Sequence, residues 1–125
     1  MKKKKRLNRK VFGKELIIDL YDCDPKIIRS AKKIKEYATK ICREIKVKPY
    51  GKAIIKRFAL HLDHAAGYSL VQLIESSLVS AHFSELWNRV YINLFSCKDF
   101  NHKKAIEFSR KFFKGKILKQ RVFIR

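Results

Sequence analysis

The sequence predicts an α+β fold, a two-layer sandwich in which a mainly antiparallel sheet is covered by two helices. Short β-branched or aromatic runs outnumber the helical segments, and four of these runs lie between the two helical segments. A parallel sheet would instead need a helix after nearly every strand. The 125 residues, of which 46% are hydrophobic, are enough for one such domain and too few for two.

The pattern begins with a strand and a long helix. Glu15–Tyr21 (ELIIDLY) is a short apolar run that ends at an acidic turn, as expected of a buried strand. Asp24 then predicts a helix N-cap, with Pro25 at the first helical position. An apolar stripe at helical spacing places this helix on the sheet; it consists of Ile27, Ile28, Ala31, Ile34, Ala38, Ile41 and Ile45.

Four more strands, a second helix and a final strand complete the predicted order. The four strands are expected at Ala53–Leu60, Tyr68–Ile74, Leu78–His82 and Val90–Phe95. Asp99 or Asn101 can cap the second helix, which Gly115 would end in the left-handed conformation. Ile117–Ile124 is the expected last strand.

Charge is the most unusual feature of the composition. Thirty-one Lys and Arg against eleven Asp and Glu give a net charge of +20, and seven of the basic residues fall in the first ten positions. We therefore expect a flexible basic arm at residues 1–12 and a single domain at residues 13–125. Contact of the arm with nucleic acid is the alternative interpretation. No apolar run of about 18 residues and no signal peptide is recognisable, which predicts a cytoplasmic protein without a membrane span.

Small polar side chains interrupt two adjacent predicted strands. Ser69 and His82 lie in them, Ser77 comes directly before the second, and Cys97 stands at the end of the next strand. Glycine-rich phosphate loops and zinc motifs are missing from the sequence, so nucleotide and zinc chemistry lose their usual support. Serine and histidine in strands can simply form local hydrogen bonds, or they can carry chemistry, and both interpretations stay open.

The spacing of these residues resembles a known enzyme family. Gly67-Tyr68-Ser69, Ser77, His82 and Phe95-Ser96-Cys97 follow, without a gap, the pattern of the prokaryotic S-adenosylmethionine decarboxylases. Members of that family cut their own backbone to make a pyruvoyl cofactor, and they pair into dimers. The resemblance spans roughly residues 13–113 and leaves the last strand outside.

The resemblance implies a role for each of these residues. Cleavage would fall between Ser76 and Ser77, and Ser77 would become the pyruvoyl group through attack of its hydroxyl on the preceding carbonyl. His82 and Ser69 would assist processing, with His82 as the candidate base near Ser77. Cys97 would return a proton after carbon dioxide leaves, since a thiol is largely protonated at neutral pH.

A second register is also compatible with the resemblance, because Glu75-Ser76 reproduces the Glu-Ser pair found at the cleavage point of the family. It would make Ser76 the nucleophile. That register moves Ala81 onto the histidine position and spoils the spacing to Ser69 and Cys97. The sequence therefore favours Ser77, with Ser76 in place of the usual glutamate.

Asp63 is the departure that bears on substrate. It lies six positions before Ser69, where the family has an aromatic residue that stacks on adenine. A carboxylate cannot stack but can bind an amine or guanidinium, so the small-molecule substrate is S-adenosylmethionine or a basic amino acid such as arginine or ornithine. A solvated loop residue is an equal interpretation of Asp63. The predicted protein is a homodimeric, pyruvoyl-dependent decarboxylase of polyamine biosynthesis; the alternative is a processing-deficient homologue that binds nucleic acid or regulates a partner.

Overall fold

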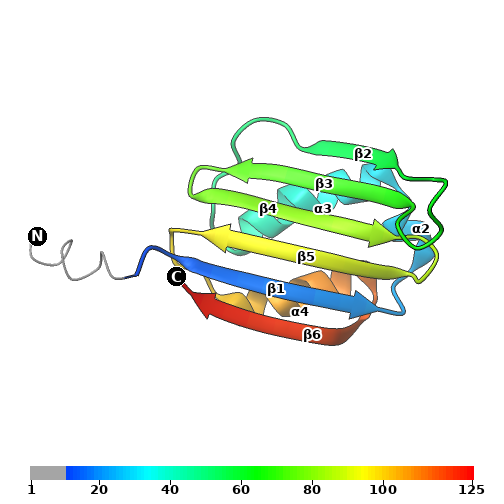
Figure 1. Cartoon of the computed structure of the whole chain (residues 1–125). Coiled ribbons are helices and arrows are strands. Elements are labelled where there is room, and N and C mark those ends of the chain that lie inside the picture. Colours follow the sequence, from blue (N-terminus) through cyan, green and yellow to red (C-terminus); the bar gives the residue numbers. More distant parts are fainter. Residues whose placement is uncertain (1–10) are drawn as a thin grey trace, which may run out of the picture.

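The computed structural model describes residues 11–125, and in this range the chain forms one six-stranded antiparallel sheet with helices on one face (Figure 1). The sheet order is β2-β3-β4-β5-β1-β6. The strands are β1 (Lys14–Tyr21), β2 (Ile54–Phe58), β3 (Gly67–Ile74), β4 (Ser77–Ser84), β5 (Arg89–Ser96) and β6 (Lys116–Ile124), and the helices are α2 (Pro25–Ile28), α3 (Ala31–Glu44) and α4 (His102–Phe113). The predicted two-layer α+β sandwich is confirmed.

The predicted flexible arm lies outside the described residues except for Val11 and Phe12. The Phe12 ring stacks on Phe95 with the centroids 5.9 Å apart, and its N–H donates to the carbonyl of Arg125. Phe12 therefore contacts the sheet, at the end where β1 begins and β6 finishes.

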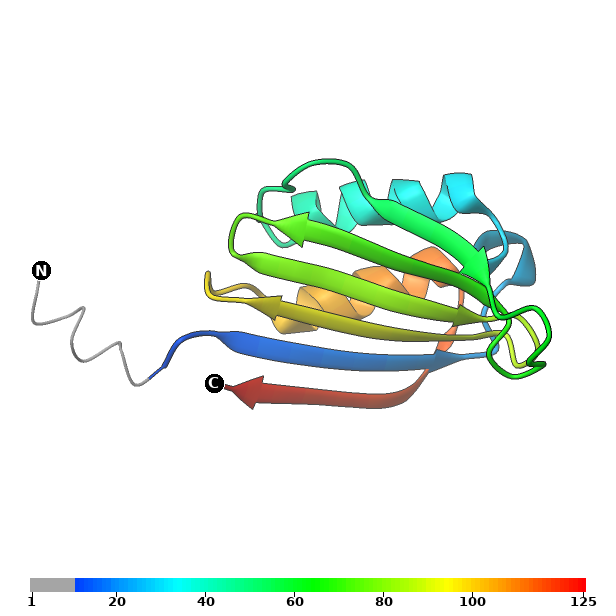
Figure 2. The ribbon, with the colours of Figure 1, turned by 45° about the horizontal axis from the view of Figure 1, so that its top comes forward.

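Both long helices lie on the same face of the sheet, and no helix formed by residues 11–125 covers the opposite face (Figure 2). Alternate residues of β1, Leu16, Ile18 and Leu20, point into the layer between sheet and helices and are fully buried. Tyr37 of α3 and Phe113 of α4 meet there with ring centroids 4.6 Å apart. The core is thus a single layer of apolar side chains between the sheet and the α3–α4 pair.

The first helix differs from its prediction because it is split into two. Pro25–Ile28 forms a single turn, and Ser30 then begins α3 by accepting a hydrogen bond from the Lys33 N–H at 3.1 Å. The apolar stripe continues through the break, so periodicity alone concealed it. Serine at this position offers the backbone an alternative to a continuous helix.

The second helix begins at one of its two predicted caps and ends differently. The Asn101 side chain accepts from the Lys104 N–H at 3.0 Å, so Asn101 and not Asp99 is the N-cap. Lys114, with φ of 52°, takes the left-handed conformation expected of Gly115. Gly115 is required for space instead, because a Cβ there would lie 2.6 Å from the sulfur of buried Cys23.

None of the helices in the described part of the chain is both long and apolar enough to cross a membrane.

Candidate active site

The residues singled out by the sequence fall into two groups, at opposite ends of β4. Ser77 is the first residue of this strand and pairs with Ser96, whereas His82 lies five residues further on and pairs with Ser69. At a rise of about 3.3 Å per residue, the two ends are about 16 Å apart. The expectation that His82 lies beside Ser77 in the same chain is therefore wrong, because an extended strand separates residues that the sequence places close together.

The backbone at Ser77 is strained. Glu75 and Ser76 form the tight turn between β3 and β4, and Ser77 follows with a φ of 149°. Residues with a Cβ rarely adopt this conformation, which costs about 1–3 kcal/mol. The strain lies on the residue that follows the Ser76–Ser77 peptide bond, so breaking this bond would relieve it.

The Ser76 carbonyl has a donor from the neighbouring strand. The Cys97 N–H donates to the Ser76 carbonyl oxygen at 2.9 Å. Such a backbone donor would stabilise negative charge if the carbonyl carbon were attacked. Buried Ser96 supports the same junction, with its Oγ 2.7 Å from the Ser76 Oγ and accepting from the Lys98 N–H at 3.1 Å.

Cys97 is exposed, whereas Cys23 and Cys42 are buried. Burial raises the pKa of Cys23 to about 12 and that of Cys42 to about 11, which makes both thiols poor proton sources near neutral pH. Cys97 borders a cavity of about 330 Å³, which Phe12 and Lys14 also line. Of the three thiols, Cys97 is the one that a small molecule can reach.

The His82 end is held by side-chain hydrogen bonds. The imidazole Nε2 lies 2.9 Å from the Ala65 carbonyl oxygen, and Nδ1 lies 2.8 Å from the Ser69 hydroxyl. Because a carbonyl oxygen can only accept, we assign the ring proton to Nε2, which leaves Nδ1 to accept from Ser69. Gly67 brings the two strands together here: its φ is 148°, and a Cβ would lie 1.9 Å from the Phe83 carbonyl oxygen.

Asp63 lies at the His82 end, in the loop between β2 and β3. It is exposed and lies two residues before Ala65, the carbonyl partner of His82. The adjacent His64 ring faces Trp87 at a centroid distance of 6.1 Å, and the His64 carbonyl accepts from the Ser84 hydroxyl at 3.3 Å. Asp63 is thus grouped with Ser69 and His82 and is separated from Ser77.

The helix-free face of the sheet exposes apolar side chains beside these groups. Near the Ser77 end, the strand register places a row of neighbours across the sheet: Leu73, Leu78, Phe95, Glu15 and Phe123. Leu73 is 46% exposed and Phe123 is also 46% exposed, although both are large and apolar. Near the other end, Ser69, His82 and Tyr91 line a hollow of about 320 Å³ on the same face. The face therefore combines exposed large apolar side chains with polar ones.

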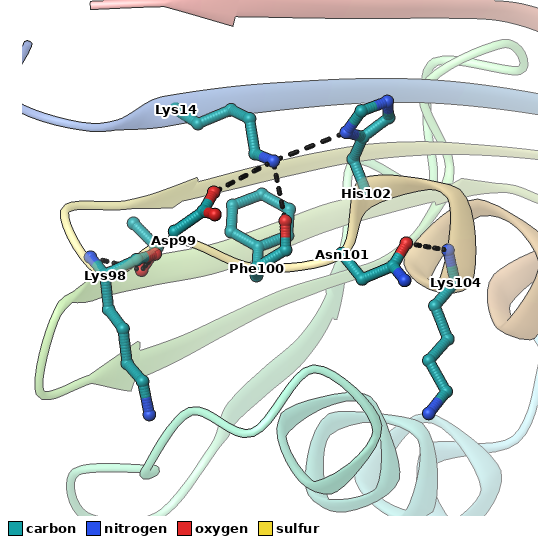
Figure 3. A network of polar contacts seen from close by, with 8 residues as sticks. Lys14, Lys98, Asp99, Phe100, Asn101, His102 and Lys104 are labelled. Atoms are coloured by element: carbon teal, nitrogen blue, oxygen red, sulfur yellow. Dashed lines mark hydrogen bonds and ion pairs between the residues drawn. The ribbon is translucent and has the colours of Figure 1, made fainter.

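Sequence reasoning missed two residues at the Ser77 end, Ser96 and Lys14. Ser96 stands between two quoted motif residues, Phe95 and Cys97, and its full burial is visible only in the fold. Lys14 is one of many lysines, and only the structure shows that its ammonium reaches the loop after Cys97 (Figure 3). A lysine at the start of a strand carries no sequence signal of such a contact.

Known proteins resemble this chain in both sequence and fold. The family model for S-adenosylmethionine decarboxylase matches residues 14–125. The crystal structure of the adenosylmethionine decarboxylase from Aquifex aeolicus is similar, with a TM-score of 0.76 at 19% sequence identity, over 92% of this chain and 91% of that chain. No curated protein sequence matches the chain. The family match continues to Arg125, so β6 lies inside it and not outside as expected from the sequence.

Proposed function

Because the chain belongs to the S-adenosylmethionine decarboxylase family, we propose that it is a self-processing decarboxylase whose pyruvoyl cofactor derives from Ser77. The observation that carries this proposal is the geometry at the Ser76–Ser77 junction. A strained Ser77 follows a carbonyl that already accepts a hydrogen bond from the Cys97 N–H. These features fit a peptide bond prepared for attack by the adjacent hydroxyl.

Self-cleavage would proceed through the Ser77 hydroxyl. Its Oγ attacks the Ser76 carbonyl carbon, the peptide C–N bond breaks, and an ester joins the two residues. A base then removes the Cα proton of residue 77, and the Cβ–O bond breaks to release the Ser76 carboxylate. Water replaces the remaining nitrogen as ammonia and leaves an α-keto group at the start of the second fragment. Each step uses only chain atoms, a base and water.

Once formed, the pyruvoyl group supplies an electron sink for the loss of carbon dioxide from an amino acid. Cys97 is the proposed source of the proton that replaces the carboxylate. Its Sγ can give up a proton at the cavity edge and recover one from solvent, because the side chain is exposed. The proposal therefore places cleavage and proton return at the same end of β4.

We propose a homodimer in which each site draws on both copies. Ser77 and Cys97 lie at one end of β4, about 16 Å from His82, so one chain does not bring the base to the nucleophile. Two copies stacked by their helix-free faces, with a two-fold axis perpendicular to the strands, would set the His82 end of one over the Ser77 end of the other. The exposed apolar row on that face supports this contact.

We also propose that the substrate is a basic amino acid, arginine or ornithine. Asp63 is exposed at the His82 end, and in the proposed dimer it would face the cleavage end of the partner. Its carboxylate can form a charge-assisted hydrogen bond with a side-chain amine or guanidinium. A protein of net charge +20 repels cations overall, so a local carboxylate is needed to hold such a substrate.

The test is a mass measurement followed by one assay. Purified protein is expected to contain fragments 1–76 and 77–125, the second without a free amine. The processed protein is then given S-adenosylmethionine, arginine and ornithine separately, and the amine products are identified. Release of agmatine or putrescine supports the basic-substrate proposal, and decarboxylated S-adenosylmethionine contradicts it. A chain that stays intact after folding would contradict the enzymatic proposal and favour a processing-deficient homologue.

A further inference from the structure

Lys14 has an unusual position for a lysine. It is the first residue of β1, and its side chain is only 13% exposed. The ammonium nitrogen lies 2.6 Å from the Phe100 carbonyl oxygen, 3.2 Å from the Asp99 carboxylate and 3.3 Å from His102 Nδ1 (Figure 3). An ammonium has three donors, and three acceptors are present here. All of them belong to the segment that follows Cys97.

The location is electrostatically costly for a cation. His102 is the first residue of α4, and the N-terminus of a helix carries partial positive charge that disfavours a lysine. Hydrogen bonding to the Lys14 ammonium lowers the pKa of Asp99 below its ordinary value, but the Asp99 side chain is 93% exposed and water screens its charge. Lys14 also lies 4.6 Å from the centre of the Phe100 ring. Two of the three contacts of Lys14 are with Asp99 and Phe100, in the loop before α4, so Lys14 holds this loop more than the helix.

The histidine of this network acts as an acceptor. An ammonium can only donate, so His102 Nδ1 must carry a lone pair towards Lys14 and the ring is neutral in this arrangement. Burial and the charges of Lys14 and Lys103 lower the pKa of His102, which favours the neutral form. The three contacts of Lys14 are therefore compatible with one another at neutral pH.

We infer that Lys14 is a positioning residue that fixes the loop carrying Cys97, so that the Cys97 N–H stays on the Ser76 carbonyl and the thiol stays at the edge of the cavity. Cys97 is held on one side by its hydrogen bond to the Ser76 carbonyl, and Lys14 holds the following residues on the other. Lys14 and Cys97 line the same cavity. The inference rests on the proposed function for what the thiol does, and on this geometry for how it is held.

The test compares Lys14→Met with Lys14→Arg, which keeps the charge and can still donate to the loop. Lys116→Met is the matched control, because Lys116 pairs with Asp22 at the other end of the sheet and both side chains are about two-thirds exposed. The first readout is amide hydrogen exchange, measured on a Ser77→Ala background that needs no processing. Lys14→Met is expected to speed exchange at residues 97–101 about tenfold or more, with α3 unchanged, whereas the other two variants keep wild-type exchange.

The second readout uses processed enzyme with the substrate that the amine assay identifies. Lys14→Met is expected to slow self-cleavage and to lower kcat about 10- to 100-fold with KM unchanged, because a misplaced proton donor affects chemistry and not binding. Lys14→Arg should recover most of this loss. Wild-type exchange at residues 97–101 in Lys14→Met would overturn the inference, as would faster exchange throughout the chain, which would mark a purely structural role. If wild-type protein fails to cleave, the proposed function fails, while the exchange experiment still tests the positioning of the loop.

Discussion

The two ends of β4 hold their polar groups in different ways. At the Ser77 end, the main features belong to the backbone. Ser77 has a strained φ, and the Ser76 carbonyl accepts a hydrogen bond from the Cys97 N–H. At the His82 end, side chains satisfy one another, and the imidazole uses both nitrogens within its own chain. A strained backbone stores free energy that bond breakage can release, whereas a satisfied side-chain pair is stable until another group competes for it. In the proposed dimer, each chain would prepare its own peptide bond and lend its imidazole to the second copy.

The strongest test of the comparison replaces the two adjacent hydroxyls separately. Ser77→Ala removes the proposed nucleophile and is expected to leave only intact chain in a mass spectrum. Ser76→Ala loses the contact with the Ser96 Oγ but keeps the attacked carbonyl, so cleavage should continue, slowed by about tenfold or less. If the Ser77→Ala chain is cleaved and the Ser76→Ala chain stays intact, the assignment is reversed and Ser76 is the nucleophile.

The second test asks whether the two ends cooperate across a dimer. His82→Ala alone is expected to slow self-cleavage about 10²- to 10⁴-fold, the contribution of a general base. Refolded together with Ser77→Ala, part of the His82→Ala chain should recover its cleavage, because the second variant supplies an intact imidazole. The Ser77→Ala chain stays uncut in the same mixture, and differently tagged chains report on both fates. Absence of recovery, with mixed dimers shown to form, would rule out the shared site.

The sequence predicted most of the fold, because apolar periodicity determines which segments form strands and which cover them. The apolar patterns predicted both long helices and the order of the strands along the chain; Glu15–Tyr21 is an example of such a strand. The break at Ser30 escaped prediction because the apolar stripe continues across it. The pairing order of the strands could not be predicted either, since β1 lies between β5 and β6 through contacts distant in sequence.

The candidate site was less predictable than the family. The resemblance to S-adenosylmethionine decarboxylases is confirmed, whereas the role of each site residue stays a prediction. The spacing of residues along the sequence identified the candidate site residues but not the distances between them in the fold. Ser77 and His82 are five residues apart in sequence and lie towards opposite ends of a strand. Lys14 acts through a long side chain across the sheet, and a single sequence does not reveal such contacts.

A third prediction concerns what the His82 end recognises. Asp63→Asn preserves the shape of the side chain and removes its charge, so it should lower kcat/KM for arginine or ornithine about 10- to 100-fold. Self-cleavage should be unaffected, because the proposal assigns Asp63 to the side chain of the substrate and not to the attacking hydroxyl or its base. Steady-state kinetics with both amino acids provide the measurement. Glu75→Gln removes another exposed carboxylate, in the β3–β4 turn, and controls for overall charge. This control requires that Glu75→Gln cleaves itself at the wild-type rate. Equal kinetics for Asp63→Asn and wild type would make Asp63 a solvated loop residue.

The smallest expected effect is on stability, at the ion pair between β2 and the turn that follows β4. Arg57 donates from Nε and Nη2 to the two Glu85 carboxylate oxygens, at 2.7 and 2.9 Å. These hydrogen bonds are the main reason why the pKa of Glu85 lies below its ordinary value of 4.5. A depressed carboxyl pKa contributes stability above the ordinary value, and this contribution is lost as the pH falls through the lowered value.

Glu85→Gln should therefore unfold at a lower temperature than wild type at about pH 6, and the difference should shrink as the pH falls below the ordinary carboxyl value of 4.5. The difference should be small, since the Arg57 side chain is 45% exposed and water screens the pair. Thermal unfolding followed by circular dichroism across this range provides the measurement, and Glu107→Gln, which removes an exposed pair with Arg110 on α4, is the matched control.

If hydrogen exchange in the loop before Gly67 rises in Glu85→Gln but not in Glu107→Gln, the ion pair holds the His82 end locally. Equal exchange in both variants would mean that the strand pairing with Ser69 is sufficient to hold it.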